Sequence, residues 1–264
     1  MTRNEYQYIL SLEKQLKVAR EGKNRALEGR LLSALGNAVL QIGNIYQAID
    51  YYEQRIEIAR ELKDRYNEGM AFGNLGNAYV MLSNAEKAIE YYDERLAIAQ
   101  EIDDRQGIGT AYGNLGVLYT NLKENTKAVE CYEQRLTIAR DMGDVKGAEA
   151  TLGNLGVLYD QLGEYDKAIA CYEQAITIAQ RTDDLYSEAM NNWNMALVQE
   201  KRGYLQHAFE LMQGAVVYFT SIDDAQKARM MQRKLRQIEK RLQAKDQNKN
   251  GATTRLRKWW HFWE

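Results

Sequence analysis

Residues 73–82 read GNLGNAYVML and place two glycines, Gly73 and Gly76, inside a segment whose apolar residues recur at helical spacing. Leu75 and Tyr79 are four residues apart, as one face of an α-helix requires. Glycine in a helix interior costs about 1 kcal/mol relative to alanine, so glycines kept there indicate a packing or ligand-binding role. The string GNLG begins again at positions 113 and 153, so this role is repeated along the chain.

The glycine belongs to a 40-residue internal repeat, which three series of residues follow in step. The series are Gly36, Gly76, Gly116, Gly156 and Ala196; Ala48, Ala88, Ala128, Ala168 and Ala208; and Tyr52, Tyr92, Tyr132, Tyr172 and Met212. Such a period is typical of repeat architectures. Five copies of one unit therefore span residues 24–222.

Each copy carries two helical patterns. Phe72, Leu75 and Tyr79 form an apolar stripe in the second copy, and a second stripe follows a break at Ser83 and Asn84. A carboxylate or amide stands where it can accept the first free N–H groups of the leading helix. These expected caps are Asn24, Asp64, Asp104, Asp144, Asp184 and Asp224. The unit is predicted to be an antiparallel helix pair, and the chain to be all-α.

The shared glycine is expected to let the two helices of a pair approach closely, because a side chain there would hold the backbones apart. We expect each glycine to face the alanine of the second helix, with the tyrosines between successive pairs. The expected contacts are Gly76 with Ala88, Gly116 with Ala128 and Gly156 with Ala168. A pair alone leaves an apolar face open, so the pairs are predicted to stack into a solenoid.

Three copies resemble the tetratricopeptide repeat (TPR), with its order of large residue, Leu-Gly, Tyr, Ala and aromatic residue. The matching residues are Phe72, Leu75, Gly76, Tyr79, Ala88 and Tyr92; Tyr112, Leu115, Gly116, Tyr119, Ala128 and Tyr132; and Leu152, Leu155, Gly156, Tyr159, Ala168 and Tyr172. HEAT and armadillo repeats have periods of about 40–47 residues, but these strings favour TPR. The resemblance implies a TPR superhelical solenoid with terminal capping helices.

Strings such as YYEQRIEIARELKD at residues 51–64 resemble the long-repeat branch found in the LGN and Pins spindle-orientation scaffolds and in bacterial and cyanobacterial TPR proteins. This resemblance implies a scaffold whose inner groove holds an extended partner peptide. We therefore expect a non-enzymatic protein–protein interaction scaffold or adaptor that binds a partner segment in its concave TPR groove. The alternative is an assembly or regulatory factor of a membrane-associated complex.

Four segments are expected along the chain. They are an N-terminal capping helix at residues 1–23, five repeats at residues 24–222, a C-terminal capping helix at residues 223–246, and a flexible, basic, Trp-rich tail at residues 247–264. Capping elements with a polar outer face are needed at both ends of a solenoid.

Asparagines recur on the first helix of the repeat, at the places that line the groove in the TPR family. They are Asn37, Asn74, Asn77, Asn114, Asn154 and Asn194. An asparagine amide offers both a donor and an acceptor, so a ladder of them can hold an extended chain. The alternative is that these amides bond only to neighbouring helices or loops.

Two further sets of groove candidates differ in character. Thr120, Asn121, Asp160 and Gln161 vary between repeats and would set partner specificity, or else they are solvated helix ends. Arg55, Arg95 and Arg135 form a second ladder. In the long-repeat scaffolds, arginines at the matching place meet acidic residues of a partner; the alternative is surface ion pairs with neighbouring glutamates.

Composition excludes several classes of protein. The 264 residues include 18 Tyr and no Pro, which favours helices, and the two cysteines, Cys131 and Cys171, do not form a disulfide framework. The start of the chain lacks a secretory signal, and no stretch approaches the roughly 20 apolar residues of a membrane span. We expect a cytoplasmic protein, with peripheral contact at a membrane as a variant.

The last residues, RLRKWWHFWE, differ from the rest. Residues 233–264 hold ten Lys or Arg and three Asp or Glu, a net charge of +7; the remaining 25 basic and 34 acidic residues give −9. The tail candidates are Arg255, Arg257, Lys258, Trp259, Trp260, Phe262 and Trp263. They suit a protein pocket, self-association through the acidic groove of a second copy, or an anionic lipid surface, unless the tail folds onto its own helix or binds nothing. The acidic body argues against nucleic acid.

The sequence lacks the combinations of residues that common catalytic sites need. His207 and His261 are the only histidines and lie in different predicted elements, so neither a metal cage nor a Ser or Cys triad is expected. Cys131 and Cys171 occupy equivalent places in adjacent copies, and we interpret them as small side chains that fill space in the core or at the surface. The string GIGTAYGNLG at residues 107–116 follows no strand and lacks a Gly-Lys-Ser/Thr ending, so it is no phosphate loop. No enzyme activity, cofactor or metal is expected.

Overall fold

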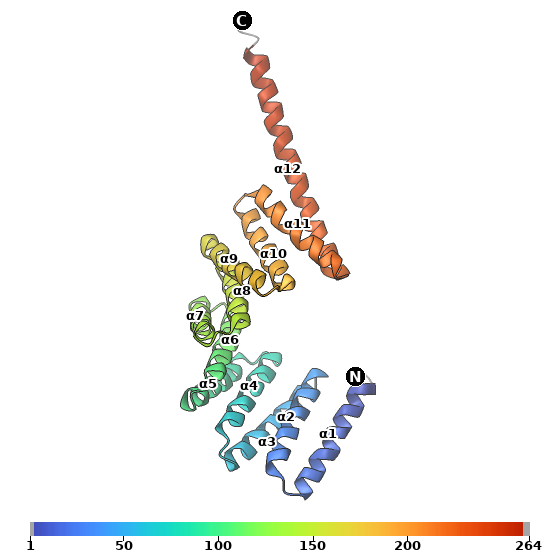
Figure 1. Ribbon diagram of the computed structural model, residues 1–264, viewed down its shortest axis with the longest axis vertical. Coiled ribbons are helices and arrows are strands. Elements are labelled where there is room, and N and C mark those ends of the chain that lie inside the picture. The colour runs from blue at the N-terminus through green and yellow to red at the C-terminus, as the bar shows by residue number, and fades with distance from the viewer. Residues whose placement is uncertain (1–2, 261–264) are drawn as a thin grey trace. The chain divides into compact units, whose positions relative to one another are not determined.

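The computed structural model describes the backbone of residues 3–260 and the side chains of residues 4–245. Within this part the chain forms twelve α-helices and no strand (Figure 1). The helices are α1 (Arg3–Glu21), α2 (Arg25–Gln41), α3 (Ile45–Glu61), α4 (Arg65–Met81), α5 (Ala85–Glu101), α6 (Arg105–Asn121), α7 (Asn125–Met142), α8 (Val145–Gln161), α9 (Tyr165–Arg181), α10 (Leu185–Lys201), α11 (Leu205–Ser221) and α12 (Ala225–Trp260). The all-α prediction is confirmed.

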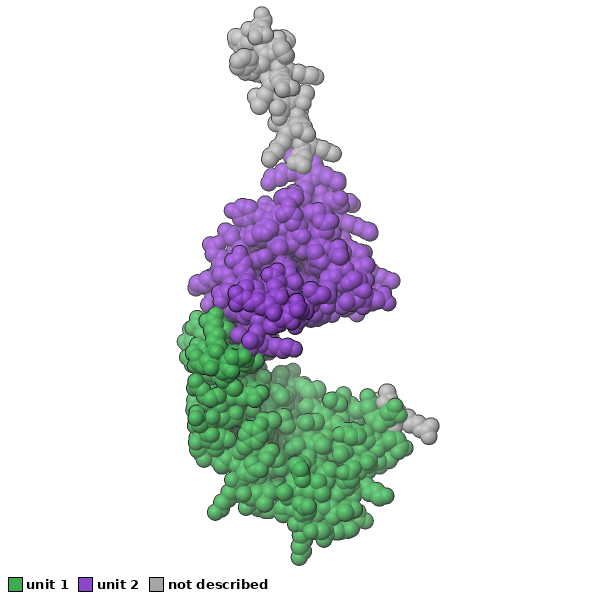
Figure 2. Space-filling model, viewed as in Figure 1, with its two compact units in different colours: residues 1–144 green, residues 145–264 purple. Residues whose placement is uncertain are grey.

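The chain divides into two compact units, residues 1–144 and residues 145–264 (Figure 2). Unit 1 contains α1 to α7, and unit 2 contains α8 to α12. In both units, helices that follow one another pack as antiparallel neighbours; the pairs are α2 with α3, α4 with α5, α6 with α7, α8 with α9 and α10 with α11. Leading helices of successive pairs also touch, α4 with α6 and α8 with α10. This is the predicted solenoid of helix pairs.

Each helix from α1 to α11 ends in a short turn that contains one residue with positive φ. A residue with positive φ recurs every 20 positions, from Lys23 (φ 51°) to Asp223 (φ 57°), and four of the eleven are glycine. At the turn after α3, the N–H of Asp64 bonds to the carbonyl of Ala59 at 2.8 Å. This closes the helix in the left-handed manner that satisfies its last carbonyls.

The same residue starts the next helix. The Asp64 carboxylate accepts the N–H of Asn67 at 3.1 Å, so one residue closes α3 and caps α4. The predicted side-chain caps Asn24, Asp104, Asp184 and Asp224 each accept an equivalent N–H bond and are confirmed. Because these turns are short, they return each helix antiparallel to the one before it within unit 1 and within unit 2.

The repeated glycine faces a tyrosine, whose ring supplies the three atoms nearest to a Cβ built on the glycine. A Cβ built on Gly76 would lie 2.4 Å from the Tyr92 ring, and Gly36, Gly116 and Gly156 face Tyr52, Tyr132 and Tyr172 in the same way. The alanines are fully buried, but the aromatic ring is what needs the free space. The tyrosines therefore fill the interior of each pair and do not simply separate successive pairs.

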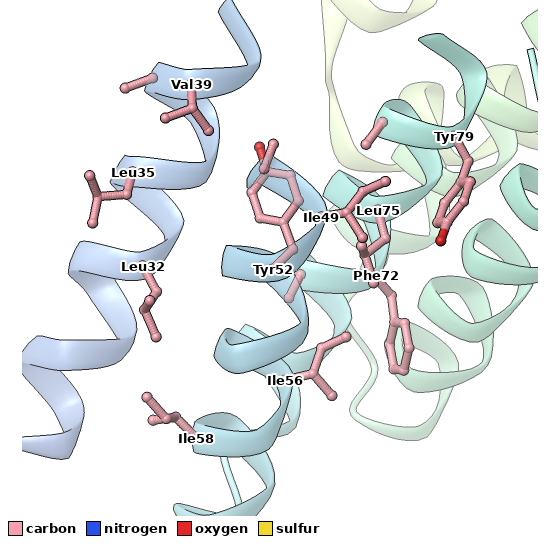
Figure 3. Close-up of a cluster of buried hydrophobic side chains, with 14 of the residues drawn as sticks. Leu32, Leu35, Val39, Ile49, Tyr52, Ile56, Ile58, Phe72, Leu75 and Tyr79 are labelled. Carbon is pink, nitrogen blue, oxygen red and sulfur yellow. The ribbon is translucent and has the colours of Figure 1, made fainter. Parts of the chain in front are cut away.

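Apolar layers continue from one pair to the next. Leu32 and Leu35 of α2 lie on one side of Tyr52 in α3, and Phe72 and Leu75 of α4 follow on the other side of that helix (Figure 3). Unit 2 has its own cluster, in which Met231 and Ile238 of α12 join α10 and α11. A second helix alone could not bury these faces, so each pair depends on its neighbours.

Buried glutamates tie successive pairs of unit 1 together. The Glu68 carboxylate is 3% exposed and accepts bonds from Arg60 on α3 and Arg65 on α4. Arg65 also pairs with Glu101 on α5. Glu28 repeats this arrangement one pair earlier, with Arg20 and Arg25.

The C-terminal helix is longer than expected. Its first part packs on α11 as the predicted capping helix, with Ala228, Met231 and Ile238 buried. The helical backbone continues beyond residue 246 to Trp260 (Figure 1).

Candidate functional site

Four asparagines predicted to line a groove lie at equivalent places on the leading helices. Asn74 on α4 and Asn114 on α6 are half-buried, and these two helices touch within unit 1. Asn154 on α8 is exposed and Asn194 on α10 is half-buried, in unit 2. None of the four amides hydrogen-bonds to another residue in the described part of the chain, so their donors and acceptors are available to a ligand.

Asn37 and Asn77 are already engaged on one side. Their Oδ1 atoms accept hydrogen bonds from the hydroxyls of Tyr52 at 2.8 Å and Tyr92 at 2.6 Å. Burial raises the pKa of each of these tyrosines to about 12, so the hydroxyls remain donors at neutral pH. Both asparagines are exposed, and their amide N–H groups still face solvent.

The variable candidates at the ends of the leading helices differ from one another. Thr120 is half-buried and donates to the carbonyl of Gly116 at 2.8 Å, and Asp160 accepts both of its bonds from Lys201 at 2.7 Å. Asn121 and Gln161 are exposed. Thr120 and Asp160 are thus held within their own unit.

Two members of the arginine ladder in unit 1, Arg55 and Arg95, are buried and are not surface ion pairs. Arg95 is 7% exposed, and its Nη1 donates to the carbonyl of Gly69 at 3.1 Å. Its Nε is buried and is without a hydrogen-bond acceptor among the described residues. The side chain fits because position 73 is glycine: a Cβ there would lie 2.8 Å from the Arg95 Cδ.

Arg55 and Arg135 repeat this arrangement with different degrees of burial. Arg55 is 4% exposed and its guanidinium lies against Gly29, where a Cβ would come within 2.0 Å of Nη1. Burial lowers the pKa of Arg55 and of Arg95, while the cap carboxylates Asp64 and Asp104 act in the opposite direction. Arg135 is half-buried and bonds directly to the next cap residue, Asp144, at 2.9 Å.

Unit 2 carries the opposite polarity at the equivalent place. Ala175 replaces the arginine, and Glu149 replaces the glycine. Glu149 is 9% exposed and accepts a hydrogen bond from Asn191 at 3.1 Å. Among the described side chains, the buried cations are therefore confined to unit 1.

Comparison with known families gives three matches along the chain. Residues 31–66, 67–141 and 150–181 each match the tetratricopeptide repeat. The chain belongs to the tetratricopeptide repeat family. A comparison of the sequence with curated proteins finds no significant match.

Solved TPR-like structures share the fold at low sequence identity. BtubC (BKLC) from P. vanneervenii has a TM-score of 0.76 and 20% identity, covering 84% of this chain and 93% of that one. The signal transduction ATPase with a tetratricopeptide repeat sensor from Pyrococcus horikoshii has a TM-score of 0.71 and 20% identity, covering 86% of this chain and 34% of that one. A Rap protein complexed with Competence and Sporulation Factor has a TM-score of 0.59 and 18% identity, covering 90% and 72%. At this level of identity the likeness concerns the fold alone.

The tail candidates of this TPR chain fall outside the described residues. The side chains of Arg255, Arg257, Lys258, Trp259 and Trp260 are not described, nor is any atom of Phe262 and Trp263. Across the described helices, none is long and apolar enough to cross a membrane. The described side chains also include no group of three or more His, Cys, Asp or Glu placed to hold a metal ion.

Sequence reasoning missed the residues that shape the arginine site. Gly29, Gly69 and Gly109 recur at the repeat interval, 26 residues before Arg55, Arg95 and Arg135. In the structure these glycines touch the arginine or the isoleucine one turn beyond it. The glycine series and the arginine series both recur every 40 residues, and this common interval could have predicted that each glycine lies near an arginine.

Proposed function

We propose that this TPR chain is a non-enzymatic adaptor and that unit 1 binds an extended, acidic segment of a partner protein. The observation that carries the proposal is the buried guanidinium of Arg95, whose Nε has no acceptor in the described structure. TPR repeats are generally protein-interaction modules, and the Rap protein of similar fold was solved in complex with Competence and Sporulation Factor.

Electrostatics favours an anionic ligand at this place. Burying a cation with incomplete hydrogen bonding is unfavourable, and the negative charge of a partner carboxylate near the guanidinium would offset part of that penalty. Arg55 and Arg95 lie one repeat apart, so acidic side chains of one extended segment could reach both in turn. Since Asp144 already pairs with Arg135, we expect the first two arginines to contribute most.

Amides beside the arginines would hold the backbone of the partner. Asn74 follows Gly73, the residue that Arg95 contacts, and Asn114 occupies the equivalent place on the neighbouring helix α6. Each amide can donate to a peptide carbonyl and accept from a peptide N–H, as in other modes of extended-peptide recognition. Such contacts fix the direction of the segment, and the guanidinium groups select its acidic residues.

The test is affinity purification with quantitative mass spectrometry, comparing the wild type with Asn74→Ala plus Asn114→Ala. We expect at least one partner to be depleted strongly by the double variant. Gln100→Ala plus Gln134→Ala is the matched control, because both amides are exposed on second helices and have no partner among the described residues. Retention of every partner by the asparagine variant, or equal loss in the control, would disprove this assignment of the site.

A further inference from the structure

Helix α12 is the leading helix of a sixth repeat that lacks its second helix. It begins at Ala225, 160 residues after α4 begins at Arg65, and Asp224 caps it as Asp64 caps α4. Its Met231 and Ile238 pack inward in the cluster with α11. Among the described residues, the face that a second helix would cover therefore has no partner.

On this uncovered face, arginines replace the glycines that α4 turns toward its second helix. Arg229 stands at the place of Gly69, Arg233 at that of Gly73 and Arg236 at that of Gly76. In the first four repeats, a single Cβ at the Gly76 position would already collide with the tyrosine ring of the second helix. Full arginine side chains there exclude a helix packed as in those four repeats.

The cations of this face are unpaired. Arg229, Arg233, Arg236 and Lys240 are exposed and make no hydrogen bond or ion pair with any described residue. With Gln232 and Gln237 they line one surface hollow of about 530 Å³. Their spacing of three or four residues places them in a row roughly 16 Å long on one side of the helix.

The C-terminal helix α12 is strongly basic, whereas a solvated capping helix needs only polar residues of either charge. The opposite cap, α1, carries three basic and three acidic residues among its described side chains at residues 4–21, so its charge is balanced. Residues 225–245 of α12 carry eight basic residues and one acidic residue. Lys234 and Arg241 pair with Glu200 on α10, which fixes the helix and leaves the other cations facing outward.

We propose that this face, with Arg229, Arg233, Arg236 and Lys240, binds the anionic surface of a phospholipid membrane. Residues 246–264 cannot neutralise it, because they are themselves basic in sequence. The helical backbone runs on past α11 to Trp260, and the sequence there holds three tryptophans and a phenylalanine behind further cations (Figure 1). Tryptophan favours the membrane interface and basic residues favour anionic lipid, so one surface accounts for both features.

The experiment is sedimentation of the full-length chain with vesicles. One set contains phosphatidylcholine with about one third phosphatidylserine, and the other contains phosphatidylcholine alone. The variant carries Arg229→Gln, Arg233→Gln, Arg236→Gln and Lys240→Gln. The control carries Lys14→Gln, Lys23→Gln, Lys123→Gln and Lys146→Gln, which removes the same charge from exposed, unpaired lysines elsewhere.

We expect the wild type to bind the phosphatidylserine vesicles and the α12 variant to lose at least about tenfold in partitioning, since each basic residue near such a surface contributes measurably. The control should change by less than about twofold. Equal losses in the two variants would overturn the proposal, as would equal binding of the wild type to both vesicle types. Tighter binding of the wild type to a single-stranded oligonucleotide than to the vesicles would also overturn it. Circular dichroism checks that both variants are folded.

Discussion

The ring of Tyr92 lies against the backbone of Gly76, in the space that any larger residue at position 76 would fill. The hydroxyl of the same tyrosine donates to Asn77 at 2.6 Å, so the ring is fixed at both ends. This pairing recurs between Gly116 and Tyr132. It makes the glycine a requirement of side-chain packing and not of backbone conformation.

Two glycines of α6 should respond oppositely to alanine. A Cβ at Gly116 would lie 2.7 Å from the Tyr132 ring, whereas the nearest atom to a Cβ at Gly113 is 3.9 Å away. We expect Gly116→Ala to destabilise by about 1–3 kcal/mol through overpacking. Gly113→Ala should stabilise by up to about 1 kcal/mol through helix propensity. Urea unfolding of both variants checks this, and a stabilised Gly116→Ala would contradict the packing role.

A glycine at position 63, in the turn after α3, should increase the stability of the folded chain. Lys63 has φ 55°, a left-handed conformation that is unfavourable for a residue with a side chain. Lys63→Gly is therefore expected to stabilise the chain by about 1 kcal/mol, measured by thermal unfolding. Gly43→Ala is the reverse control, because Gly43 has φ 82° and a Cβ there would meet no other atom. If Gly43→Ala proved neutral, backbone strain would not govern these turns.

Acid should weaken the tie between α1 and α2. Burial raises the pKa of Glu28, but hydrogen bonds from Arg20 and Arg25 outweigh it, so the folded pKa lies below the ordinary value of 4.5. The stabilisation is therefore complete above pH 4.5 and is lost as the pH falls through the lowered value. Glu28→Gln should cost about 1–3 kcal/mol at pH 7 and little at pH 3. Denaturant unfolding at both pH values measures this, with the exposed Glu133→Gln as control; a loss that did not depend on pH would refute the linkage.

Replacing Arg95 should separate binding from stability. Arg95→Met removes a buried cation whose Nε has no acceptor while keeping an unbranched chain beside Gly73. Exchange of a buried charge for an apolar side chain is often neutral or stabilising, so we expect unchanged or higher resistance to urea. Capture of the acidic partner should fall at least about tenfold. A strongly destabilised Arg95→Met variant would mean that the guanidinium serves the fold.

Periodicity made most of the fold predictable. The 40-residue interval, the alternating apolar stripes and the cap residues such as Asp64 and Asp104 specify helix pairs and their junctions through local chemistry. Local patterns do not state which residue a glycine faces. The ring of Tyr92 takes that place because the second helix turns this side chain inward and leaves Tyr91 only half-buried, and this depends on the rotation of both helices.

The candidate site was only partly predictable. The asparagine and arginine ladders are visible as series, but the sequence left open whether the arginines meet a partner or pair at the surface with neighbouring glutamates. Arg95 is buried because Gly73 on the facing helix leaves room for it, which is a tertiary relationship. The basic face of α12 was likewise not predicted. It is recognised only when Arg236 is aligned with Gly76 and α12 is seen to have no second helix packed against that face.

The double role of Asp64 has a consequence for how such a chain can change its length. Residues 64–65 and 104–105 are both Asp-Arg, so excision of residues 65–104 would join Asp64 to Arg105 and recreate a native junction. The cap, the closing bond to Ala59 and the start of α6 would all survive the cut. Gene duplication or deletion of this 40-residue segment would therefore preserve the junction between the repeats that it joins, so the chain could gain or lose a repeat without a new kind of connection.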